Sequence, residues 1–299
     1  MKPVPFDYKR PDNLDEVLEI LSAKEDARII AGGQSLIPML AMRLARPSCL
    51  IDIARISSLS GIRVANDYLT IGATTRHVEV ETSAAVARAC PLLSAAMPWV
   101  GHAPIRSRGT IGGSVAHADP AAEIPLVLVT LGGELTLASN AGKRTIAAHD
   151  FLAGPMMTTA AEDECLTEIR VPTWQQQKIG VGFHEVANRR SDFAIVSATA
   201  QIAIDEDGKC IACAVGLGGV VETPISLSSA FATLVGTRPD DRKIQDLASE
   251  AVTDLSAMSD PSASASYRKR AAVKLLCQAV GDAVQNASGQ GQNAGGQGR

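Results

Sequence analysis

The sequence predicts an α+β protein with two domains. The chain has 299 residues, which is close to the upper limit for a single hydrophobic core. In the first half, short apolar runs alternate with helix-like segments and with two pairs of glycines. After residues 172–178 the pattern changes to two long strand-like runs and then to helical segments. We therefore expect a mixed domain over residues 1–176, with subdomains at about 1–56 and 57–176, and a smaller domain over 177–286.

The first elements form a βαβ-like unit. Asn13 followed by Glu16 has the form of a capping box, which predicts a helix immediately after it. A strand over 28–31, a helix from 36 to about 44 and a strand over 49–53 follow in order.

The second subdomain combines strands, helices and a long glycine-containing loop. Apolar and β-branched residues predict strands, and longer apolar stretches predict helices. The elements expected here are a strand over 69–73, helical material over 78–97, a loop over 101–120, a helix over 122–131 and strands over 133–139 and 164–172.

The last domain contains an antiparallel hairpin and helices. Residues 194–205 and 209–220 alternate as strands and are joined by an Asp-Glu-Asp-Gly turn. Three helices are expected near 226–235, 240–257 and 262–286. The Gly/Gln-rich tail 287–299 has nothing to bury, so we expect it to be disordered.

Composition excludes several functions. A formal net charge of −4 without a basic stripe argues against nucleic-acid binding. The start of the chain lacks the apolar region of a secretory signal, and no apolar run reaches the roughly 18 residues of a membrane span. We expect a cytoplasmic, soluble protein.

The six cysteines do not form a metal-binding pattern. Only Cys210 and Cys213 have C-x-x-C spacing, and they lie in a segment that is predicted to be a strand. Residues three apart on a strand point to opposite faces, so we expect this pair neither to bridge nor to share a metal. An iron–sulfur or zinc site is therefore not expected on this chain.

The first glycine pair lies between a strand and a helix, in the segment AGGQS. Gly32 and Gly33 allow close approach of a ligand, and the helix that follows presents unpaired N–H groups to an anion. Ser35 adds a hydroxyl, and Pro38 suits an early helical position. The segment indicates a phosphate site, although a tight turn without a ligand has the same composition. It lacks the third glycine of a Rossmann fingerprint and the lysine of a P-loop.

The second glycine pair occurs in residues 108–123, RGTIGGSVAHADPAAE. Hydroxyl residues flank Gly112 and Gly113, and an acid, Glu123, stands at the start of an apolar helix. Two such loops, about 75 residues apart, are suited to hold two parts of one long ligand such as a dinucleotide.

These two segments carry a family resemblance. AGGQSLIPML and TIGGSVAHADPAAEIP resemble the FAD-binding medium subunit of the molybdenum hydroxylases, the group that contains carbon monoxide dehydrogenase and xanthine dehydrogenase. FDYKRPDNLDEVLEIL, IGATTRHVEV, RRSDFAIVSATA and SASYRKRAAVKLL extend the likeness over nearly the whole chain. The resemblance implies a two-subdomain FAD-binding domain of the PCMH/VAO-like type, followed by a smaller α+β C-terminal domain with an antiparallel sheet and packed helices.

The resemblance also implies cofactor-binding residues and no catalytic residue. The first loop would cradle the FAD pyrophosphate and the second would lie along the cofactor. These loop residues are Ala31, Gly32, Gly33, Gln34, Ser35, Leu36, Thr110, Ile111, Gly112, Gly113 and Ser114.

Four further residues match flavin-contacting positions of the family. Glu123 stands where relatives place an acid that hydrogen-bonds FAD, although a helix-start acid that interacts with the dipole is the alternative. Leu166 and His184 align with flavin contacts, although a basic side chain is more usual in place of His184. Phe193 stands near the flavin ring in relatives, or is a core aromatic. No histidine precedes Thr75, so we expect non-covalent FAD.

The implied function is electron transfer within a complex. A large partner subunit would carry molybdopterin, and a small one would carry [2Fe–2S] clusters. This chain would pass electrons through FAD to NAD, a quinone or oxygen. By analogy with the family alone, it would do so as part of a dimer of heterotrimers. Two alternatives are a stand-alone flavin-dependent oxidoreductase of the same superfamily and a non-catalytic assembly subunit whose FAD site has decayed. The substrate and the acceptor are not specified by the sequence.

Overall fold

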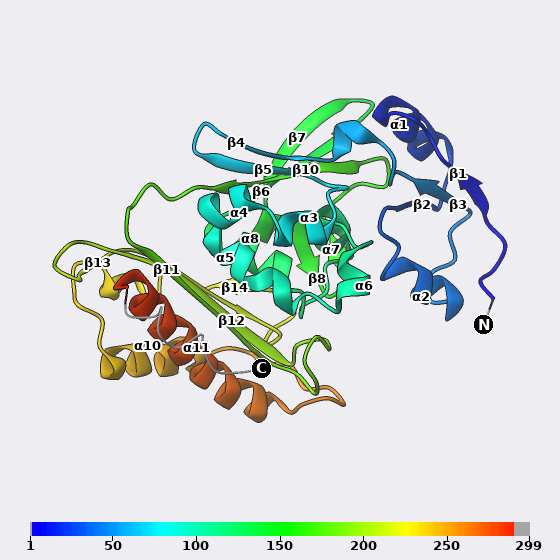
Figure 1. The fold of residues 1–299 in the computed structure, drawn as a ribbon. Coiled ribbons are helices and arrows are strands. Elements are labelled where there is room, and N and C mark those ends of the chain that lie inside the picture. The colour runs from blue at the N-terminus through cyan, green and yellow to red at the C-terminus, as the bar shows by residue number, and fades with distance from the viewer. Residues whose placement is uncertain (1, 290–299) are drawn as a thin grey trace.

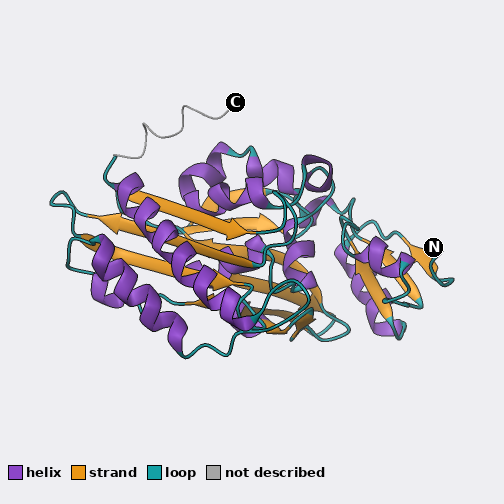
Figure 2. Cartoon of the chain, turned by 90° about the horizontal axis from the view of Figure 1, so that it is seen from below, coloured by secondary structure: helices purple, strands orange, loops and turns teal. Residues whose placement is uncertain are grey.

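The computed structural model describes residues 2–289, which form three sheet-based units arranged along the chain (Figure 1). The first is a three-stranded parallel sheet in the order β1-β3-β2, and Figure 2 shows it set to one side of the other two. Its elements are β1 (Asp7–Lys9), α1 (Leu14–Ala23), β2 (Ala27–Ile30), α2 (Leu36–Ala41) and β3 (Cys49–Asp52).

Helix α1 begins where the capping box predicts. The Asn13 side chain accepts a hydrogen bond from the Glu16 N–H at 3.0 Å, and Val17, Leu18 and Leu21 then pack against the small parallel sheet. Strands β2 and β3 pair in parallel with α2 between them in the chain, so the βαβ prediction is confirmed, with β1 as an additional strand on β3.

The second unit is a five-stranded antiparallel sheet in the order β4-β5-β10-β6-β7, covered by a layer of short helices. Its strands are β4 (Ile62–Ala65), β5 (Tyr68–Gly72), β6 (Glu134–Ser139), β7 (Gly142–Ala147) and β10 (Cys165–Pro172), with a separate hairpin of β8 (Leu152–Gly154) and β9 (Met157–Thr158). Its helices are α3 (His77–Glu81), α4 (Ala84–Ala89), α5 (Pro91–Ala96), α6 (Ala103–Arg106), α7 (Ile111–His117), α8 (Glu123–Leu131) and α9 (Ala148–Phe151), with 3₁₀ turns at Ser57–Leu59 and Met97–Trp99.

The expected loop over 101–120 is wrong in part, because it contains α6 and α7. Glycine disfavours helix interiors, and the two glycines of α7 therefore conceal the helix in the sequence. Helix α7 forms because its first N–H groups, those of Ile111 and Gly112, donate to the carbonyl oxygens of Thr75 and Ala73.

The third unit is a four-stranded antiparallel sheet in the order β11-β12-β13-β14, with α11 on one face and α8 and α5 against the other. It contains β11 (Ile179–Val186), β12 (Val196–Ile204), β13 (Cys210–Gly218), β14 (Ile225–Ser226), α10 (Asp241–Thr253) and α11 (Ala265–Ala287). Every residue of β12 is buried, as expected for a strand covered on both faces. The first of the three expected helices is only a 3₁₀ turn, Ala232–Leu234.

The expected orientation of the cysteine pair is wrong. Pairing shifts register at Ile211, where a bulge leaves Cys210 opposite Ile204 and Ala212 opposite Ala203. Both side chains consequently pack into or against the same core, and Cys210 Sγ donates to Ala212 O at 3.4 Å. The proximity of the two thiols lowers the pKa of Cys210 and raises that of Cys213. Both are free thiols.

The structure bears on the expectations about membrane spans and about the C-terminal tail only within the described residues. No helix of residues 2–289 combines the length and apolar character that crossing a membrane requires. The predicted disorder of the tail falls mostly on residues 290–299, outside the described residues, and α11 itself reaches Ala287.

Candidate functional site

A cavity of about 1340 Å³ lies where the three units meet. Its walls come from the end of β2 and the start of α2, from α7 and the start of α8, and from the turn between β11 and β12. The volume exceeds the 300–1,000 Å³ that is usual for small-ligand pockets, so it admits an extended ligand.

The first glycine loop presents free amide groups to this cavity. Gly33 has φ +72°, a left-handed conformation that turns the chain sharply between β2 and α2. Within the described part of the chain, the backbone N–H groups of residues 32–35 donate to no protein acceptor. The Ser35 hydroxyl makes no capping bond either. Four successive unpaired donors at a helix start are the arrangement that binds phosphate oxygens.

The two glycine loops touch each other. A Cβ on Gly32 would lie 2.4 Å from the carbonyl oxygen of Arg108 and 2.8 Å from Cα of Gly109, so only glycine permits this approach. The guanidinium of Arg76 donates to the same Arg108 carbonyl and holds the second loop in place. Segments far apart in the sequence therefore form one continuous wall.

The second loop contributes shape rather than free amides. The N–H of Ile111 donates to Thr75 O at 3.0 Å, and that of Gly112 donates to Ala73 O at 2.9 Å. The N–H of Gly113 donates to the hydroxyl of Thr110 at 3.2 Å. Its amides are thus already satisfied, and the loop offers a side-chain-free surface along the cavity. Ile111 is fully buried and does not line it.

Glu123 and Leu166 form part of the inner wall. Glu123 is the first residue of α8 and is only 8% exposed. Burial raises the pKa of its carboxyl to about 7, with a smaller contribution in the same direction from Asp119. Leu166 on β10 is buried and lines the same space.

Phe193 and His184 lie in different environments although they are close in sequence. Phe193 follows the β11–β12 turn, lines the cavity and is 75% exposed, so the alternative of a core aromatic is wrong. His184 points to the opposite face of β11, where its Nε2 lies 2.8 Å from Asp282 Oδ2 on α11. It does not line the cavity, because alternate residues of a strand face opposite sides.

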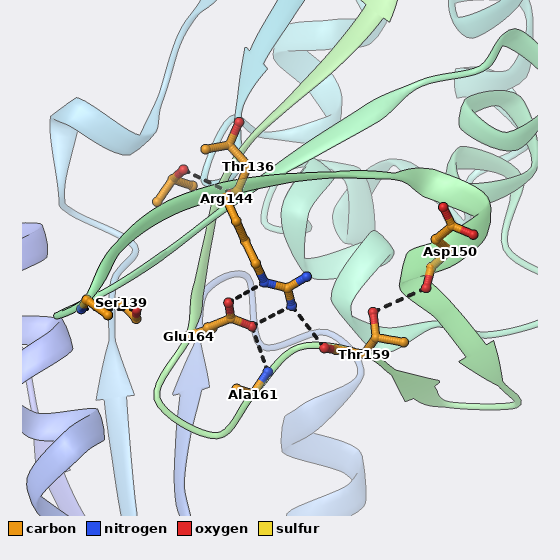
Figure 3. Close-up of polar contacts among 9 residues, drawn as sticks. Thr136, Ser139, Arg144, Asp150, Thr159, Ala161 and Glu164 are labelled. Atoms are coloured by element: carbon orange, nitrogen blue, oxygen red, sulfur yellow. Dashed lines mark hydrogen bonds and ion pairs between the residues drawn. The ribbon is translucent and has the colours of Figure 1, made fainter.

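An ion pair fixes a further wall of the cavity (Figure 3). The guanidinium of Arg144 on β7 donates two hydrogen bonds to the carboxylate of Glu164, from Nε to Oε1 at 2.5 Å and from Nη2 to Oε2 at 2.8 Å. Arg144 Nη2 also donates to Thr159 O at 3.0 Å, and Glu164 Oε2 accepts the N–H of Ala161 at 2.7 Å. The segment 158–165, several residues of which line the cavity, is thereby tied to the edge of the sheet.

Sequence reasoning missed lining residues that come from the C-terminal domain. Met258, Asp260 and Ser262 lie in an irregular segment before α11, and Arg268 follows on that helix. Arg268 donates to the carbonyl oxygens of Ile195 and Gly219 and to Asp260. No local motif marks these residues, and only their packing across the two domains reveals them.

Two consecutive parts of the chain match two known families. Residues 4–174 match the FAD binding domain in molybdopterin dehydrogenase, and residues 182–283 match the CO dehydrogenase flavoprotein C-terminal domain. The chain belongs to the family of FAD-binding flavoprotein subunits of the molybdenum hydroxylases. The resemblance inferred from the sequence and the α+β fold that it implied are both confirmed.

Individual relatives of this flavoprotein subunit cover almost its full length. It is 36% identical over 288 residues to the 6-hydroxypseudooxynicotine dehydrogenase complex subunit alpha of Paenarthrobacter nicotinovorans, covering 96% of this chain and 97% of that one. It is 40% identical over 238 residues to the caffeine dehydrogenase subunit beta of Pseudomonas sp. strain CBB1, covering 79% and 80%. Among solved structures, a chain of quinoline 2-oxidoreductase from Pseudomonas putida 86 superposes with a TM-score of 0.91 at 37% identity, covering 96% and 99%.

Proposed function

We propose that this flavoprotein subunit binds FAD non-covalently in the cavity and carries electrons within a molybdenum hydroxylase complex. The observation that carries the proposal is the set of four unpaired N–H groups at residues 32–35, which opens into a cavity long enough for a dinucleotide. These residues are half-buried and line the cavity, so their N–H groups are open to the phosphate oxygens of a bound ligand.

The predicted cofactor contacts agree with this cavity for the most part. The loop residues, Glu123, Leu166 and Phe193 line it, with the exceptions of Ile111 and His184. We propose that the backbone N–H groups of the first loop bind the pyrophosphate. We also propose that α7 packs along the cofactor through the glycine surface of Gly112 and Gly113, without donating hydrogen bonds from its first amides. The non-covalent mode is supported by Gln34, since several related flavin oxidases attach FAD through a histidine in this loop.

Membership of the flavoprotein family supports a division of labour among subunits. When bound, FAD supplies a carrier that exchanges electrons one or two at a time. Among the described residues, no group of three or more potential metal ligands converges. We propose that a small subunit delivers electrons from [2Fe–2S] clusters, that a large molybdopterin subunit hydroxylates the substrate, and that NAD, a quinone or oxygen accepts the electrons, in a dimer of heterotrimers.

Cofactor analysis tests this proposal. The chain would be purified alone, its visible spectrum recorded and the cofactor released by denaturation identified by chromatography. We expect FAD in the released fraction, because no covalent bond holds it. A folded protein that neither retains nor rebinds added FAD would refute the site. Affinity purification from the native host then tests the complex, with a molybdenum-containing large partner and an iron–sulfur small partner as the expected result.

A further inference from the structure

Strand β11 presents two faces that belong to different parts of the molecule. Gly180, Gly182 and His184 face α11, where a Cβ on either glycine would meet the helix backbone at 2.0 to 2.1 Å. The alternate residues Phe183 and Glu185 must then face the FAD-binding domain. Phe183 does so, since its ring lies 6.0 Å from that of Trp99.

The carboxyl group of Glu185 lies in a buried region between the two domains. We call this region, formed by Glu185, Ser197 and the first turn of α8, the seam. Both carboxylate oxygens are out of reach of solvent, and neither has a hydrogen-bond partner within residues 2–289. Ser197, directly opposite on β12, is fully buried, and its Oγ also lacks a partner in the same described range. Two unpaired polar side chains therefore lie in register on the face that α8 covers.

The first turn of α8 completes this seam. Ser197 pairs with Gly218 on β13, and a Cβ on Gly218 would lie 2.7 Å from Ser197 Oγ, 3.3 Å from Leu126 of α8 and 3.6 Å from the carbonyl oxygen of Pro120. Glu123 lies between Pro120 and Leu126 in the sequence, at the helix start. Glu185 and Ser197 thus lie on the face of the sheet against which the start of α8 packs, and Glu123 at that helix start also lines the cavity.

The two carboxyl groups cannot both ionise at low cost. Burial and, to a smaller extent, the charge of Glu123 together raise the pKa of Glu185 to about 8. The other charged groups of this region interact with partners other than Glu185. Asp119 raises the pKa of Glu123, Arg268 binds two carbonyls and Asp260, and His184 pairs with Asp282 on the far face. Arg190 lies over the Trp99 ring. Among the described residues, none of these cations pairs with Glu185.

We propose that Glu185 is a positioning residue that holds a proton for Glu123, so that the pair presents a single negative charge, on Glu123, to the flavin cavity. The proposal rests on the proposed FAD site. Glu123 as a carboxylate only accepts hydrogen bonds, and the hydroxyl groups of FAD are donors to it. A buried carboxyl group that has neither a hydrogen-bond partner nor a cation is least costly in its neutral form, so the protonated Glu185 keeps the charge of the seam at one. Loss of that proton would place a second charge beside the first.

The test compares FAD affinity across pH in the full chain and in two variants. Apo-protein is titrated with FAD from pH 6.5 to 9.5, and the dissociation constant is measured by quenching of flavin fluorescence. In the wild type we expect affinity to fall about tenfold between pH 7 and 9, the effect of one unit of coupling between the carboxyls. Glu185→Gln keeps the size and the neutral form of the side chain, so its affinity should not fall between pH 7 and 9, where the remaining carboxyl group, Glu123, only becomes more fully ionised. A decline as steep as that of the wild type would overturn the proposal.

A matched control and a flavin-free readout accompany this titration. Glu206→Gln removes an acid whose side chain is 82% exposed, and it should follow the wild-type curve. Infrared spectroscopy of apo-protein at pH 7 should show the carbonyl stretch of protonated carboxylic acid, which Glu185→Gln weakens, while Glu123, whose pKa is about 7, contributes the remainder. An unchanged band in that variant would also overturn the proposal. If no FAD binds at any pH, the proposed function fails, and the infrared band still decides where the proton is.

Discussion

At the scale of single residues, Gly33 carries the phosphate hypothesis. We predict that Gly33→Asp weakens FAD binding by about 100-fold or more, because a carboxylate beside the pyrophosphate opposes its charge. The matched control is Gly33→Asn, which has the same shape without the charge and tolerates the positive φ of 72°. Isothermal titration with FAD measures both. Equal affinities for the two variants would mean that no phosphate lies at this loop.

Phe193 tests a different part of the same cavity. Because its side chain is 75% exposed, Phe193→Ala should change the free energy of unfolding by no more than about 0.5 kcal/mol. We predict that FAD stays bound while its reduction potential or its rate of reoxidation changes, since the aromatic ring at the cavity mouth is lost. Potentiometric titration and stopped-flow reoxidation measure these quantities. Values identical to wild type for both would remove Phe193 from the flavin environment.

The predicted loop residues that line the cavity share one property, which is that their pattern is local in the sequence. The glycine loop needs only the strand before it and the helix after it, and it is visible in AGGQS. The environment of His184 depends on which face of β11 the second domain covers, which no local pattern records. The orientation of Cys213 likewise depends on a bulge at Ile211 that the alternating pattern does not reveal.

At the scale of elements, the Arg144–Glu164 pair links β7 to the cavity wall. We predict that Arg144→Ala lowers the free energy of unfolding by about 1 kcal/mol or less, the range for exposed but bidentate pairs, measured by urea denaturation. Arg144 lowers the pKa of Glu164, so the pair stabilises the fold above the usual carboxyl pKa of 4.5 and loses this effect as the pH falls. The variant should therefore lose less stability on acidification than the wild type.

The control for this element is the more exposed pair Lys178–Glu206. Lys178→Ala should change the free energy of unfolding and its acid dependence less than Arg144→Ala does, because Glu206 makes no bond to a loop backbone comparable to that of Glu164 with Ala161. If both variants behave alike, Arg144 acts only as surface charge, and the wall formed by 158–165 depends on other contacts.

Elements were predictable where periodicity and caps agree. Helix α1 has both, whereas α7 has neither a clean apolar period nor a favourable composition. Thr75 and Ala73, whose carbonyls accept the first N–H groups of α7, lie more than 30 residues earlier in the sequence, so tertiary contacts determine this helix. The short strand β1 was missed for a similar reason, since its partner β3 is distant in the chain.

At the scale of the whole molecule, the seam between the domains sets the geometry of the site. Helix α8 carries Glu123 at its start and packs along β12 and β13. The two domains therefore position the cavity wall together, and the match of residues 4–174 and 182–283 to two separate families marks the parts that meet there. A change in the packing of α8 should be transmitted to FAD even when it lies far from the loops.

Gly216 on β13 provides that test. A methyl group there would lie 1.8 Å from Oγ1 of Thr130, whose side chain is 4% exposed and donates to Leu126 O within α8. Gly216→Ala must displace the helix or rotate Thr130, so we predict a loss of about 1–3 kcal/mol in the free energy of unfolding, together with weaker FAD binding. Gly281→Ala is the matched control: it lies within α11 with open space around it, and should stabilise by about 0.5–1 kcal/mol and leave FAD affinity unchanged. Urea denaturation and FAD titration on both variants measure this. If Gly216→Ala lost stability but kept full FAD affinity, α8 would be a structural support whose position the flavin site does not sense.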